Sequence, residues 1–531
     1  MSKTKKQTFI QGILILMFSQ VFVKLLGLIY KLYLTNKEGF GDTGNAIYSS
    51  GFQIYALLLT ISSVGVPNAV AKLVSEKVSI GDEKGGLRIF KIAFVMFGII
   101  GFVSSTILFM NAKYIAVNLL QIPQAEMTLQ ALAPAIFFVS VLSVFRGFFN
   151  ASGDMRPTAN SQTIEQLAKT FFTIAIVEYI YMHINVNNKT ELMAAGANIA
   201  TTIATIVCFI YLFMCYKKYK INKTVNCTYK RDKISIIVKN ILIVSMPITI
   251  TAILGTINKN IDSITVVRCL KNFLSEQEAT IQYGILIGKV DTLVTLPMSF
   301  NMALSTSLVP TISSAKAKNQ LIEVNNKIKF SILITILIAL PCSVGMIIFA
   351  NPILKLLFPN ASAGTFIYQM SAIAIVFILI NQTITAILQG LGKQIMPVFA
   401  LLVGVILKLI INLILIPIDP KKFILGGTVG ASVGTIACYF VAMVINIYIL
   451  NKNTKIKFNK IDFYIKPIIC TTVMIITSWI VFFLLKNQMK EKYATIFSIL
   501  FAIIVYFVMI ITTKTLRCKS LKPLKTQRSS R

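Results

Sequence analysis

Long apolar stretches, separated by short polar ones, recur along the whole chain and constrain its fold more than any other feature. Windows of roughly 20 apolar residues give about fourteen candidate helices. The chain has 531 residues, of which 56% are hydrophobic and 13% are charged. Its mean hydropathy of +0.76 is higher than a soluble globular protein of this length shows. We therefore expect an all-α polytopic membrane protein without a large soluble domain.

The candidate helices fall into groups of six, six and two. A polar, strongly basic stretch separates the first two groups and is the clearest linker in the sequence. The sequence thus predicts two six-helix lobes and a C-terminal helix pair. The predicted segments are the N-terminal lobe (1–216), the basic cytoplasmic linker (217–235), the C-terminal lobe (236–451), the helix pair (452–513) and a basic cytoplasmic tail (514–531).

Several stretches of the first lobe have counterparts in the second. In residues 145–174 a span ends, a Gly turn follows, a Pro opens the next helix and Lys169 lies further along; residues 386–415 repeat this order with Lys408. Four such echoes occur in the same order at separations of about 235 to 245 residues, which indicates an internal repeat. An even number of spans in each repeat predicts pseudo-symmetric lobes related by an axis along the membrane normal, with a central cavity and alternating access.

The distribution of positive charge predicts the orientation. If the N-terminus is cytoplasmic, about 35 of the 52 Lys and Arg residues lie in inside loops and tails, and about 11 lie in outside loops. Both termini are therefore expected in the cytoplasm. The net charge of +33 and the basic tail are then interpreted as contacts with anionic membrane lipids and not with nucleic acid.

Two lysines lie within the first apolar stretch. Lys24 and Lys31 are seven residues apart, so that both side chains project from nearly the same helix face. A lysine inside a span costs about 3 kcal/mol on insertion scales, and such residues usually face a bundle interior or a wet cavity. The alternative is that the long side chain reaches the headgroups, and Lys31, which is closer to the helix end, is the stronger candidate for it.

Other charges in the spans form pairs that are close in sequence. Glu165 and Lys169 are four apart and Lys259 and Asp262 are three apart, so each pair can share one helix face. We interpret the first pair as structural, whereas the second is equally compatible with a functional role.

After this pairing an excess of cations remains. Lys289 and Asp291 are two apart and point in different directions, so that Lys289 is a third cation without a simple local partner. A cavity lined in this way suits an anionic group such as phosphate. The candidate substrate-binding cations are Lys24, Lys31 and Lys289, and the candidate polar or gating residues of the cavity are Asn45, Ser49, Gln53, Lys259, Asp262 and Asp291.

The sequence contains no motif for catalysis. It has no H-E-x-x-H, no G-x-x-x-x-G-K-[ST] and no G-x-S-x-G, and its single histidine, His183, lies at the end of a span. The eight cysteines show no C-x-x-C spacing and are expected to be small core residues. We expect no enzyme activity, no catalytic residue, no cofactor and no metal.

Four stretches carry a family resemblance: KLLGLIYKLYLT, IYSSGFQIYALLLTISSVGVPNAVAKLVSE, RGFFNASGDMRPTANSQTIEQLAK and TLVTLPMSFNMALSTSLVPTIS. They resemble the polysaccharide-biosynthesis branch of the MOP flippase superfamily, and within it the stage V sporulation group and the MurJ-like lipid II flippases. The resemblance implies a multi-pass protein of the bacterial cell membrane that moves a lipid-linked sugar pyrophosphate from the inner to the outer leaflet. Lys24, three residues before Gly27, and Lys31 match the cations of first spans in such flippases.

The predicted partners are a polyprenyl-pyrophosphate-linked saccharide and anionic lipids, bound by a monomer. Two alternatives stay open at this stage. A drug or cation exporter of the same superfamily would need an anionic cavity, and a non-transporting scaffold for cell-wall or spore-cortex assembly would need no cavity at all. A membrane-embedded glycosyl transferase is disfavoured, because the longest outside loops have only about 15 residues, too few for the carboxylates and arginines of such a site.

Overall fold

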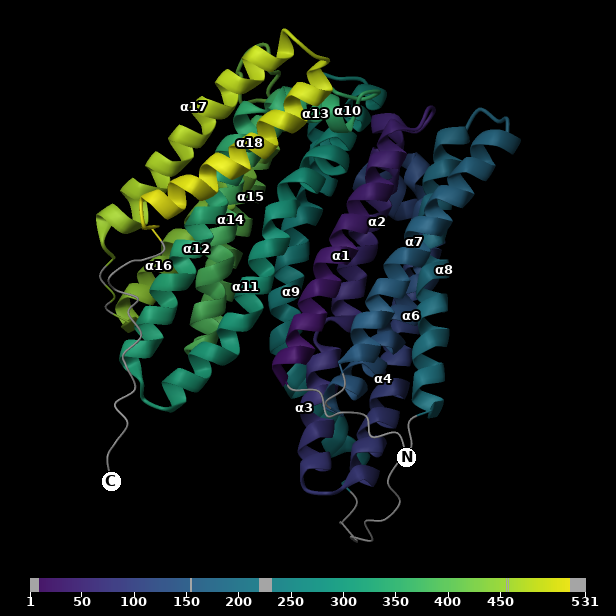
Figure 1. The fold of residues 1–531 in the computed structure, drawn as a ribbon. Coiled ribbons are helices and arrows are strands. Elements are labelled where there is room, and N and C mark those ends of the chain that lie inside the picture. The colour runs from purple at the N-terminus through teal and green to yellow at the C-terminus, as the bar shows by residue number, and fades with distance from the viewer. Residues whose placement is uncertain (1–8, 153–154, 219–231, 455, 457, 516–531) are drawn as a thin grey trace. The chain divides into compact units, whose positions relative to one another are not determined.

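The structure is a computed structural model that describes residues 9–152, 155–218, 232–454, 456 and 458–515 (Figure 1). All regular secondary structure in these residues is helical, which confirms the all-α prediction. The helices are α1 (Phe9–Asn36), α2 (Gly41–Ser63), α3 (Val66–Ser79), α4 (Glu83–Met110), α5 (Ala112–Tyr114), η1 (Ile115–Leu120), η2 (Pro123–Ala125), α6 (Glu126–Ala151), α7 (Arg156–His183), α8 (Lys189–Lys218), α9 (Ile234–Leu270), α10 (Glu276–Tyr283), η3 (Gly284–Val290), α11 (Asp291–Ala317), α12 (Leu321–Ile348), α13 (Ala350–Leu357), α14 (Thr365–Gly390), α15 (Ile395–Leu415), α16 (Thr428–Thr454), η4 (Ile461–Ile465), α17 (Lys466–Lys486) and α18 (Glu491–Thr512).

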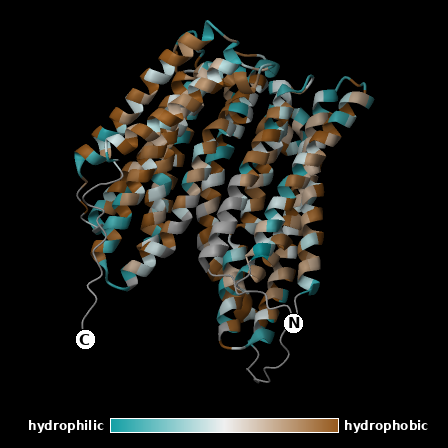
Figure 2. Cartoon of the chain, viewed as in Figure 1, coloured by the Kyte–Doolittle hydropathy of each residue, from teal (hydrophilic) through white to brown (hydrophobic). Residues whose placement is uncertain are grey.

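Eleven helical segments within the described residues are long and apolar enough to cross a membrane. Figure 2 shows apolar residues in brown along most of the helices, with hydrophilic residues in teal gathered at the helix ends. A helix satisfies its own backbone hydrogen bonds, which lipid cannot do, and this is why apolar stretches of this length form helices. The chain is therefore a multi-pass membrane protein. Helices α1, α7 and α11 would complete the expected fourteen spans, and that number stays a prediction.

Helices α2 and α3 form one membrane segment with a bend in its middle. Val64, after the end of α2, keeps helical dihedral angles, and α3 resumes at Val66 with Pro67 in its first turn. Proline has no backbone N–H to donate to the preceding turn, so that a bend at this position costs little. The bend leaves the N-terminal half of α2 as a straight helix, and the polar residues described below lie on it.

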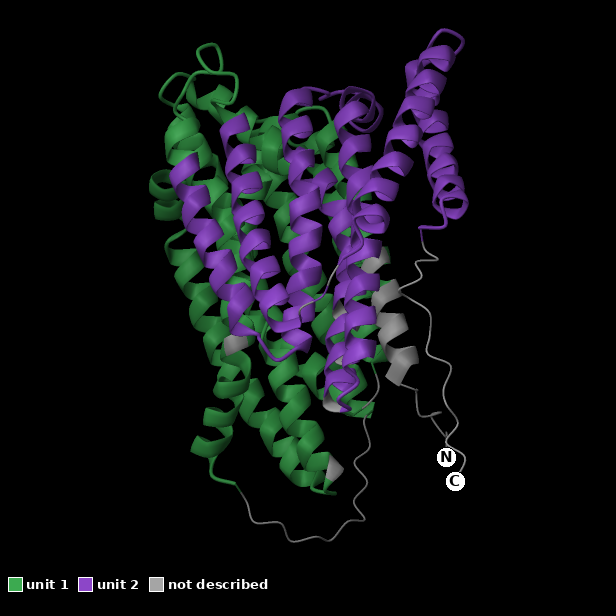
Figure 3. Cartoon of the chain, turned by 90° about the vertical axis from the view of Figure 1, so that its left-hand side faces the viewer, with its two compact units in different colours: residues 1–289, 412–428 green, residues 290–411, 429–531 purple. Residues whose placement is uncertain are grey.

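The chain forms two compact units, drawn in green and purple in Figure 3. Unit 1 comprises residues 1–289 and 412–428, and unit 2 comprises residues 290–411 and 429–531. Helix α9 belongs to unit 1 because it packs on α2, α3 and α4. This differs from the expected boundary between lobes at 217–235, most of which, residues 219–231, lies outside the described residues, as do residues 516–531 of the expected tail. The division into lobes therefore stays a prediction.

Helix α6 is the centre of unit 1. It packs against α2, α3, α4 and α8, while α7 packs against α1 and α8. Near the ends of α4, α6 and α8 the ring of Phe90 lies 5.3 Å from Phe145, 4.9 Å from Phe148 and 4.9 Å from Tyr216, measured between ring centroids. This scaffold positions α1, α2 and α7, and two buried lysines of unit 1 lie on them, Lys31 on α1 and Lys169 on α7.

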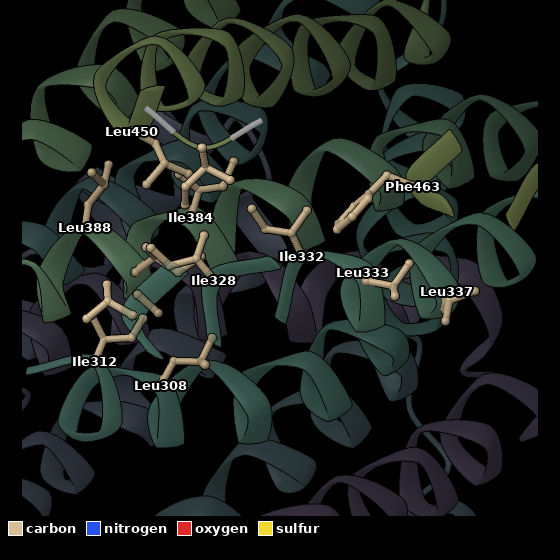
Figure 4. Packing of buried hydrophobic residues seen from close by; sticks show 14 of the residues in the cluster. Leu308, Ile312, Ile328, Ile332, Leu333, Leu337, Ile384, Leu388, Leu450 and Phe463 are labelled. Atoms are coloured by element: carbon tan, nitrogen blue, oxygen red, sulfur yellow. The ribbon is translucent and has the colours of Figure 1, made fainter. Parts of the chain in front are cut away.

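In unit 2, α14 packs against both α11 and α12, and α17 packs against α12 and α18. Figure 4 shows the interdigitating apolar side chains, among them Ile312 of α11, Ile328 of α12, and Ile384 and Leu388 of α14. Lipid tails are as apolar as these side chains, so that close packing and interhelical hydrogen bonds hold the helices together in a membrane.

Candidate functional site

Lys31 lies inside unit 1, bound to two side chains of α2. Its Nζ donates hydrogen bonds to Asn45 Oδ1 and to Ser49 Oγ, both at 3.1 Å, and only 7% of the residue is exposed. Asn45 and Ser49 are four apart on α2 and therefore share the helix face that meets α1. The alternative that Lys31 reaches the headgroups is wrong, because the ammonium is turned inward and hydrogen-bonded there.

The acceptors of Lys31 are themselves held in place. Asn45 Nδ2 donates to Thr35 Oγ1 at 2.8 Å, and Thr35 Oγ1 donates to the carbonyl oxygen of Lys31 at 2.9 Å. These bonds fix the Asn45 amide with its oxygen toward the lysine. The site thus has a positioned cation whose hydrogen-bond acceptors Asn45 and Ser49 are neutral.

A second lysine, Lys169 of α7, is buried beside aromatic rings that adjoin the first. Its Nζ lies 4.4 Å from the ring centroid of Phe52 and 5.3 Å from that of Tyr30. The ring of Tyr48 is near both lysines, 4.5 Å from Lys31 Nζ and 6.0 Å from Lys169 Nζ. We call Lys31, Asn45, Ser49, Tyr48 and Lys169 the Lys31 cluster. Two unit charges no further apart than the sum of these two distances repel by at least about 1.5 kcal/mol at an effective dielectric constant of about 20, so an anion is expected to stabilise the cluster.

The expected pair between Glu165 and Lys169 is wrong. Glu165 instead accepts from Arg146 of α6 at 2.6 Å, and Arg146 also donates to Ser161 Oγ at 3.1 Å. The hydroxyl of Thr158 on α7 donates to the carbonyl oxygen of Arg146 on α6 at 3.4 Å, so that the end of α6 lies beside the start of α7. The arginine is better placed than Lys169, which points among the rings. The interpretation of Lys169 as a structural cation neutralised by Glu165 is therefore wrong.

Lys289 is also buried, and it has a carboxylate partner that its sequence neighbours do not reveal. Its Nζ lies 2.9 Å from both carboxylate oxygens of Asp42, at the start of α2. Lys289 is fully buried, whereas Asp42 is 12% exposed. The expectation concerned only partners close to Lys289 in the sequence, and it could not include Asp42, because the pairing joins residues 247 positions apart. The assignment of Lys289 as a substrate-binding cation stays a prediction.

The backbone of segment η3, which carries Lys289, lies directly against α2. A side-chain carbon added at Gly284 would lie 2.0 Å from the carbonyl oxygen of Asp42, and one added at Gly288 would lie 2.6 Å from Cβ of Asn45. Only glycine fits at these two positions. Segments with π-helical geometry such as η3 are frequent at functional sites. This contact places the Lys289–Asp42 pair next to Asn45 of the Lys31 cluster.

A capping box begins α10, the short helix before η3. Ser275 Oγ accepts from the backbone N–H of Glu278 at 3.3 Å, and Glu278 Oε2 accepts from the backbone N–H of Ser275 at 3.1 Å. The hydrogen bonds from the Ser275 hydroxyl and backbone lower the pKa of the Glu278 carboxyl. The cap fixes the start of α10 and so the position of η3.

The remaining candidates of unit 1 are placed as follows. Lys24 is exposed on α1, two turns before Lys31. Gln53 is half-buried on α2, and its backbone carbonyl accepts from Asn260 Nδ2 of α9 at 3.2 Å. The side-chain roles of Lys24 and Gln53 stay predictions.

The candidates on and after α9 lie in other surroundings. Asp262 is buried and accepts from Asn412 Nδ2 at 3.0 Å, while Lys259 is half-buried. Asp291, the first residue of α11, is half-buried. Their gating roles also stay predictions.

The structure adds four residues that the sequence-based site omitted: Asp42, Tyr48, Lys169 and Arg146. Lys169 and Arg146 carried a usable signal, since each is a charge inside an apolar span. Asp42 and Tyr48 carried none, because one lies in a polar segment at a helix start and the other is an ordinary aromatic residue. Among the described residues no group of three His, Cys, Asp or Glu side chains is arranged to hold a metal ion.

Fold and site together define a class: polytopic helical membrane proteins with lysines buried among their helices. Residues 9–316 match the family described as polysaccharide biosynthesis protein, and residues 287–414 match the MatE family. Because the first match covers more than half of the chain, the protein belongs to the polysaccharide biosynthesis protein family. The resemblance to the MOP flippase superfamily is thereby confirmed.

The similar proteins include two well-covered relatives from Bacillus subtilis (strain 168). The chain is 26% identical to stage V sporulation protein B over 76% of its own length and 77% of that protein, and 25% identical to the lipid II flippase MurJ over 77% of each. A solved structure of the lipid II flippase MurJ in an inward closed conformation superposes with a TM-score of 0.66 at 16% identity, over 95% of this chain and all of that one. The structural similarity establishes the shared fold.

Proposed function

We propose that this protein is a flippase that moves a lipid-linked saccharide diphosphate from the inner to the outer leaflet of a bacterial cell membrane. The observation that carries the proposal is the Lys31 cluster, in which a buried lysine is positioned by neutral acceptors beside a second buried lysine. Support also comes from the relatives, one of which is a lipid II flippase. Lys24 and Lys289 are proposed to extend the cationic lining.

The geometry suggests how an anion would bind. Lys31 donates to amide and hydroxyl oxygens, and a phosphate oxygen is a stronger acceptor than either. Binding would exchange a neutral acceptor for a charged one and would remove the repulsion between the cations. A substrate of this kind binds more tightly to a state in which the lysines are accessible, and so shifts the protein toward that state. We propose that alternating access between the two leaflets follows substrate binding.

The remaining expectations belong to the same proposal. The protein acts as a monomer with both termini in the cytoplasm, uses no cofactor and catalyses no covalent step. Its basic loops contact anionic lipids, and its substrate is a polyprenyl-diphosphate-linked saccharide. Asn45, Ser49, Gln53, Lys259, Asp262 and Asp291 line or gate the path.

The test measures the leaflet in which a labelled lipid-linked saccharide diphosphate is accessible, in cells that depend on this protein. We expect the wild type to expose the precursor on the outer leaflet, and the Lys24→Ala, Lys31→Ala double variant to leave it inside while reaching the membrane in equal amount. Outer-leaflet precursor at the wild-type level in the double variant would refute the binding role. If the protein supports growth of these cells without moving the precursor between leaflets, a scaffold is favoured. If it exports organic cations, an exporter is favoured.

A further inference from the structure

Pro341 lies inside α12, in a stretch that is otherwise regular helix. Proline has no backbone N–H to donate to the carbonyl oxygen four residues earlier, which here belongs to Leu337, and its ring crowds that oxygen. A proline inside a helix therefore bends the helix and destabilises it. Because α12 is a candidate membrane span that packs against α11, α14 and α17, water does not readily supply the missing donor. The Leu337 carbonyl thus needs a partner from another helix.

Tyr506 of α18 supplies this partner. Its hydroxyl donates to the carbonyl oxygen of Leu337 at 2.7 Å, and the tyrosine is buried. The two residues are 169 positions apart, and their side chains belong to the same apolar cluster, in which Figure 4 labels Leu337. A carbonyl oxygen without a donor is costly in a membrane, and a neighbouring helix is a usual source of the replacement. Tyr506 thus replaces the hydrogen bond that Pro341 removes.

Apolar packing brings the C-terminal helix pair, α17 and α18, against the rest of unit 2. Cys470 of α17 and Ile510 of α18 belong to the same cluster, and the ring centroid of Trp479 lies 5.8 Å from that of Phe349, which follows α12. Such packing has little directional preference in a membrane, where lipid tails are as apolar as the side chains. The hydrogen bond of the tyrosine hydroxyl adds a directional contact, and its acceptor is available because α12 contains a proline.

Hydrogen bonds to other helices hold α12 on both sides of Pro341. Thr335 Oγ1 donates to Asn301 Oδ1 of α11 at 3.2 Å, and Ser343 Oγ donates to the carbonyl oxygen of Ala372 on α14 at 2.8 Å. The bend therefore belongs to the folded arrangement of unit 2. Alanine in place of the proline would let the helix make its own hydrogen bond, so that stability does not explain the proline. Residues that break a local rule in this way are expected at functional or strained sites.

We propose that Pro341 and Tyr506 form a braced bend in unit 2: the proline gives α12 a bend that the transport cycle requires, and Tyr506 is the positioning residue that holds this bend. The brace gives the C-terminal helix pair a role, because α18 completes the hydrogen bonding of α12. Without the tyrosine hydroxyl, the Leu337 carbonyl would lack its donor and α12 would sample several bends. The need for the bend rests on the proposed function, whereas the brace itself does not.

The first test measures the brace in the purified full-length chain in nanodiscs. Trp479 is the only tryptophan of the chain, and its fluorescence follows the packing of α17 during thermal unfolding. We expect Tyr506→Phe to lower the unfolding midpoint by about 2 °C or more, because a buried carbonyl loses its donor. Pro341→Ala restores an N–H four residues after Leu337. The double variant Pro341→Ala, Tyr506→Phe should therefore unfold within about 1 °C of Pro341→Ala alone.

Hydrogen exchange of the native samples gives a second reading that needs no unfolding. Exchange of the α12 amides around Pro341 should become about fivefold faster or more in Tyr506→Phe, and the double variant should exchange as Pro341→Ala does. Tyr493→Phe is the matched control, because it removes the same group from an exposed position of the same helix, and it should change neither reading. Wild-type readings in Tyr506→Phe would overturn the brace, and so would a loss that Pro341→Ala does not rescue.

The second test measures transport of a labelled lipid-linked precursor in proteoliposomes. Pro341→Ala should lower kcat about fivefold or more and keep KM within about twofold, although the variant is at least as stable as the wild type. Loss of structure would lower stability and rate together, so this combination identifies a role of the bend. A wild-type kcat in Pro341→Ala would overturn the need for the bend. If the wild type moves no precursor, the proposed function and the need for the bend both fall, whereas the brace stands on the unfolding and exchange readings.

Discussion

The Lys31 cluster of unit 1 contains charged side chains, whereas one buried polar cluster of unit 2, around Asn301, is neutral. In unit 2, Asn301 of α11 donates through Nδ2 to Gln382 Oε1 at 3.0 Å and to the carbonyl oxygen of Leu379 at 3.0 Å. Its Oδ1 accepts from Thr335 of α12 at 3.2 Å and from Thr383 of α14 at 3.3 Å, and the two threonine hydroxyls lie 2.7 Å apart. We call Asn301, Thr335, Thr383 and Gln382 the Asn301 cluster.

The difference separates a structural role from a binding role. In the Asn301 cluster both ends of the asparagine amide have partners, and the bonds tie three helices together, as expected of a polar network that stabilises packing. In the Lys31 cluster two cations lie near one ring. Burial alone therefore does not distinguish the two clusters, whereas charge does, and the proposed binding role of the Lys31 cluster rests on this difference.

The largest effect on stability is expected where a charge in unit 1 has a full counter-charge. Asp42→Asn leaves the ammonium of Lys289 buried without its carboxylate, and breaking a buried pair in this way costs about 3 to 5 kcal/mol. Unfolding of the purified variant in mixed micelles measures the loss. The double variant Asp42→Asn, Lys289→Met also removes the ammonium group left without Asp42. It should therefore regain at least half of the lost unfolding free energy. A loss below about 1 kcal/mol in the single variant would show that the pair contributes little.

The second-largest effect is expected on the transport rate, when the Lys31 cluster itself is changed. Lys31→Ala removes the cation that Asn45 and Ser49 position, and we expect the flipping rate to fall about 100-fold, which corresponds to about 2.7 kcal/mol. The rate is measured with labelled precursor in proteoliposomes. Thr335→Val in the Asn301 cluster is the control, and its rate per folded molecule should equal that of the wild type. Equal losses in both variants would remove the distinction between the clusters.

The sequence predicted most of the fold because lipid leaves a chain few alternatives. An apolar stretch of about 20 residues must satisfy its backbone internally and therefore forms a helix. The sequence did not predict η3 or the bend between α2 and α3, since both depend on contacts with other helices. It also did not predict that α9 joins unit 1, because an apolar helix shows no preference for one neighbour in its composition.

The surroundings of candidate residues were predicted where burial follows from chemistry. Lys31, Asn45 and Ser49 are buried and in contact, as expected because polar groups within a span must face protein or water. Partners far apart in the sequence were missed. Lys289 pairs with Asp42 across 247 positions, and Glu165 pairs with Arg146 of the preceding helix instead of the residue one turn away. Spacing along one helix identifies possible partners, and packing between helices selects among them.

A third prediction concerns the neutral cluster. Asn301→Leu removes the amide that is hydrogen-bonded to Gln382, Thr335, Thr383 and the carbonyl oxygen of Leu379, and the loss of these bonds together should cost about 2 to 3 kcal/mol of unfolding free energy. The affinity for pyrophosphate should stay unchanged, because the cluster is neutral. Thermal unfolding of the nanodisc sample and a calorimetric titration with inorganic pyrophosphate, the charged part of the proposed substrate, supply the two readings. A change of affinity without loss of stability would assign the Asn301 cluster to binding and contradict its structural role.

The smallest effect is expected for a lysine of unit 2 that is exposed. Lys327 of α12 lies 2.8 Å from Glu323, one turn away, with side chains 33% and 46% exposed. Water screens such a pair, so that Lys327→Ala should cost less than about 0.5 kcal/mol in unfolding and leave flipping and pyrophosphate binding unchanged. The same removal of one ammonium group from Lys31 is expected to abolish most transport, and the two variants differ chiefly in burial and in the neighbouring cation. A loss of transport in Lys327→Ala that approaches the loss in Lys31→Ala would mean that total positive charge drives transport, and the Lys31 cluster would lose its special role.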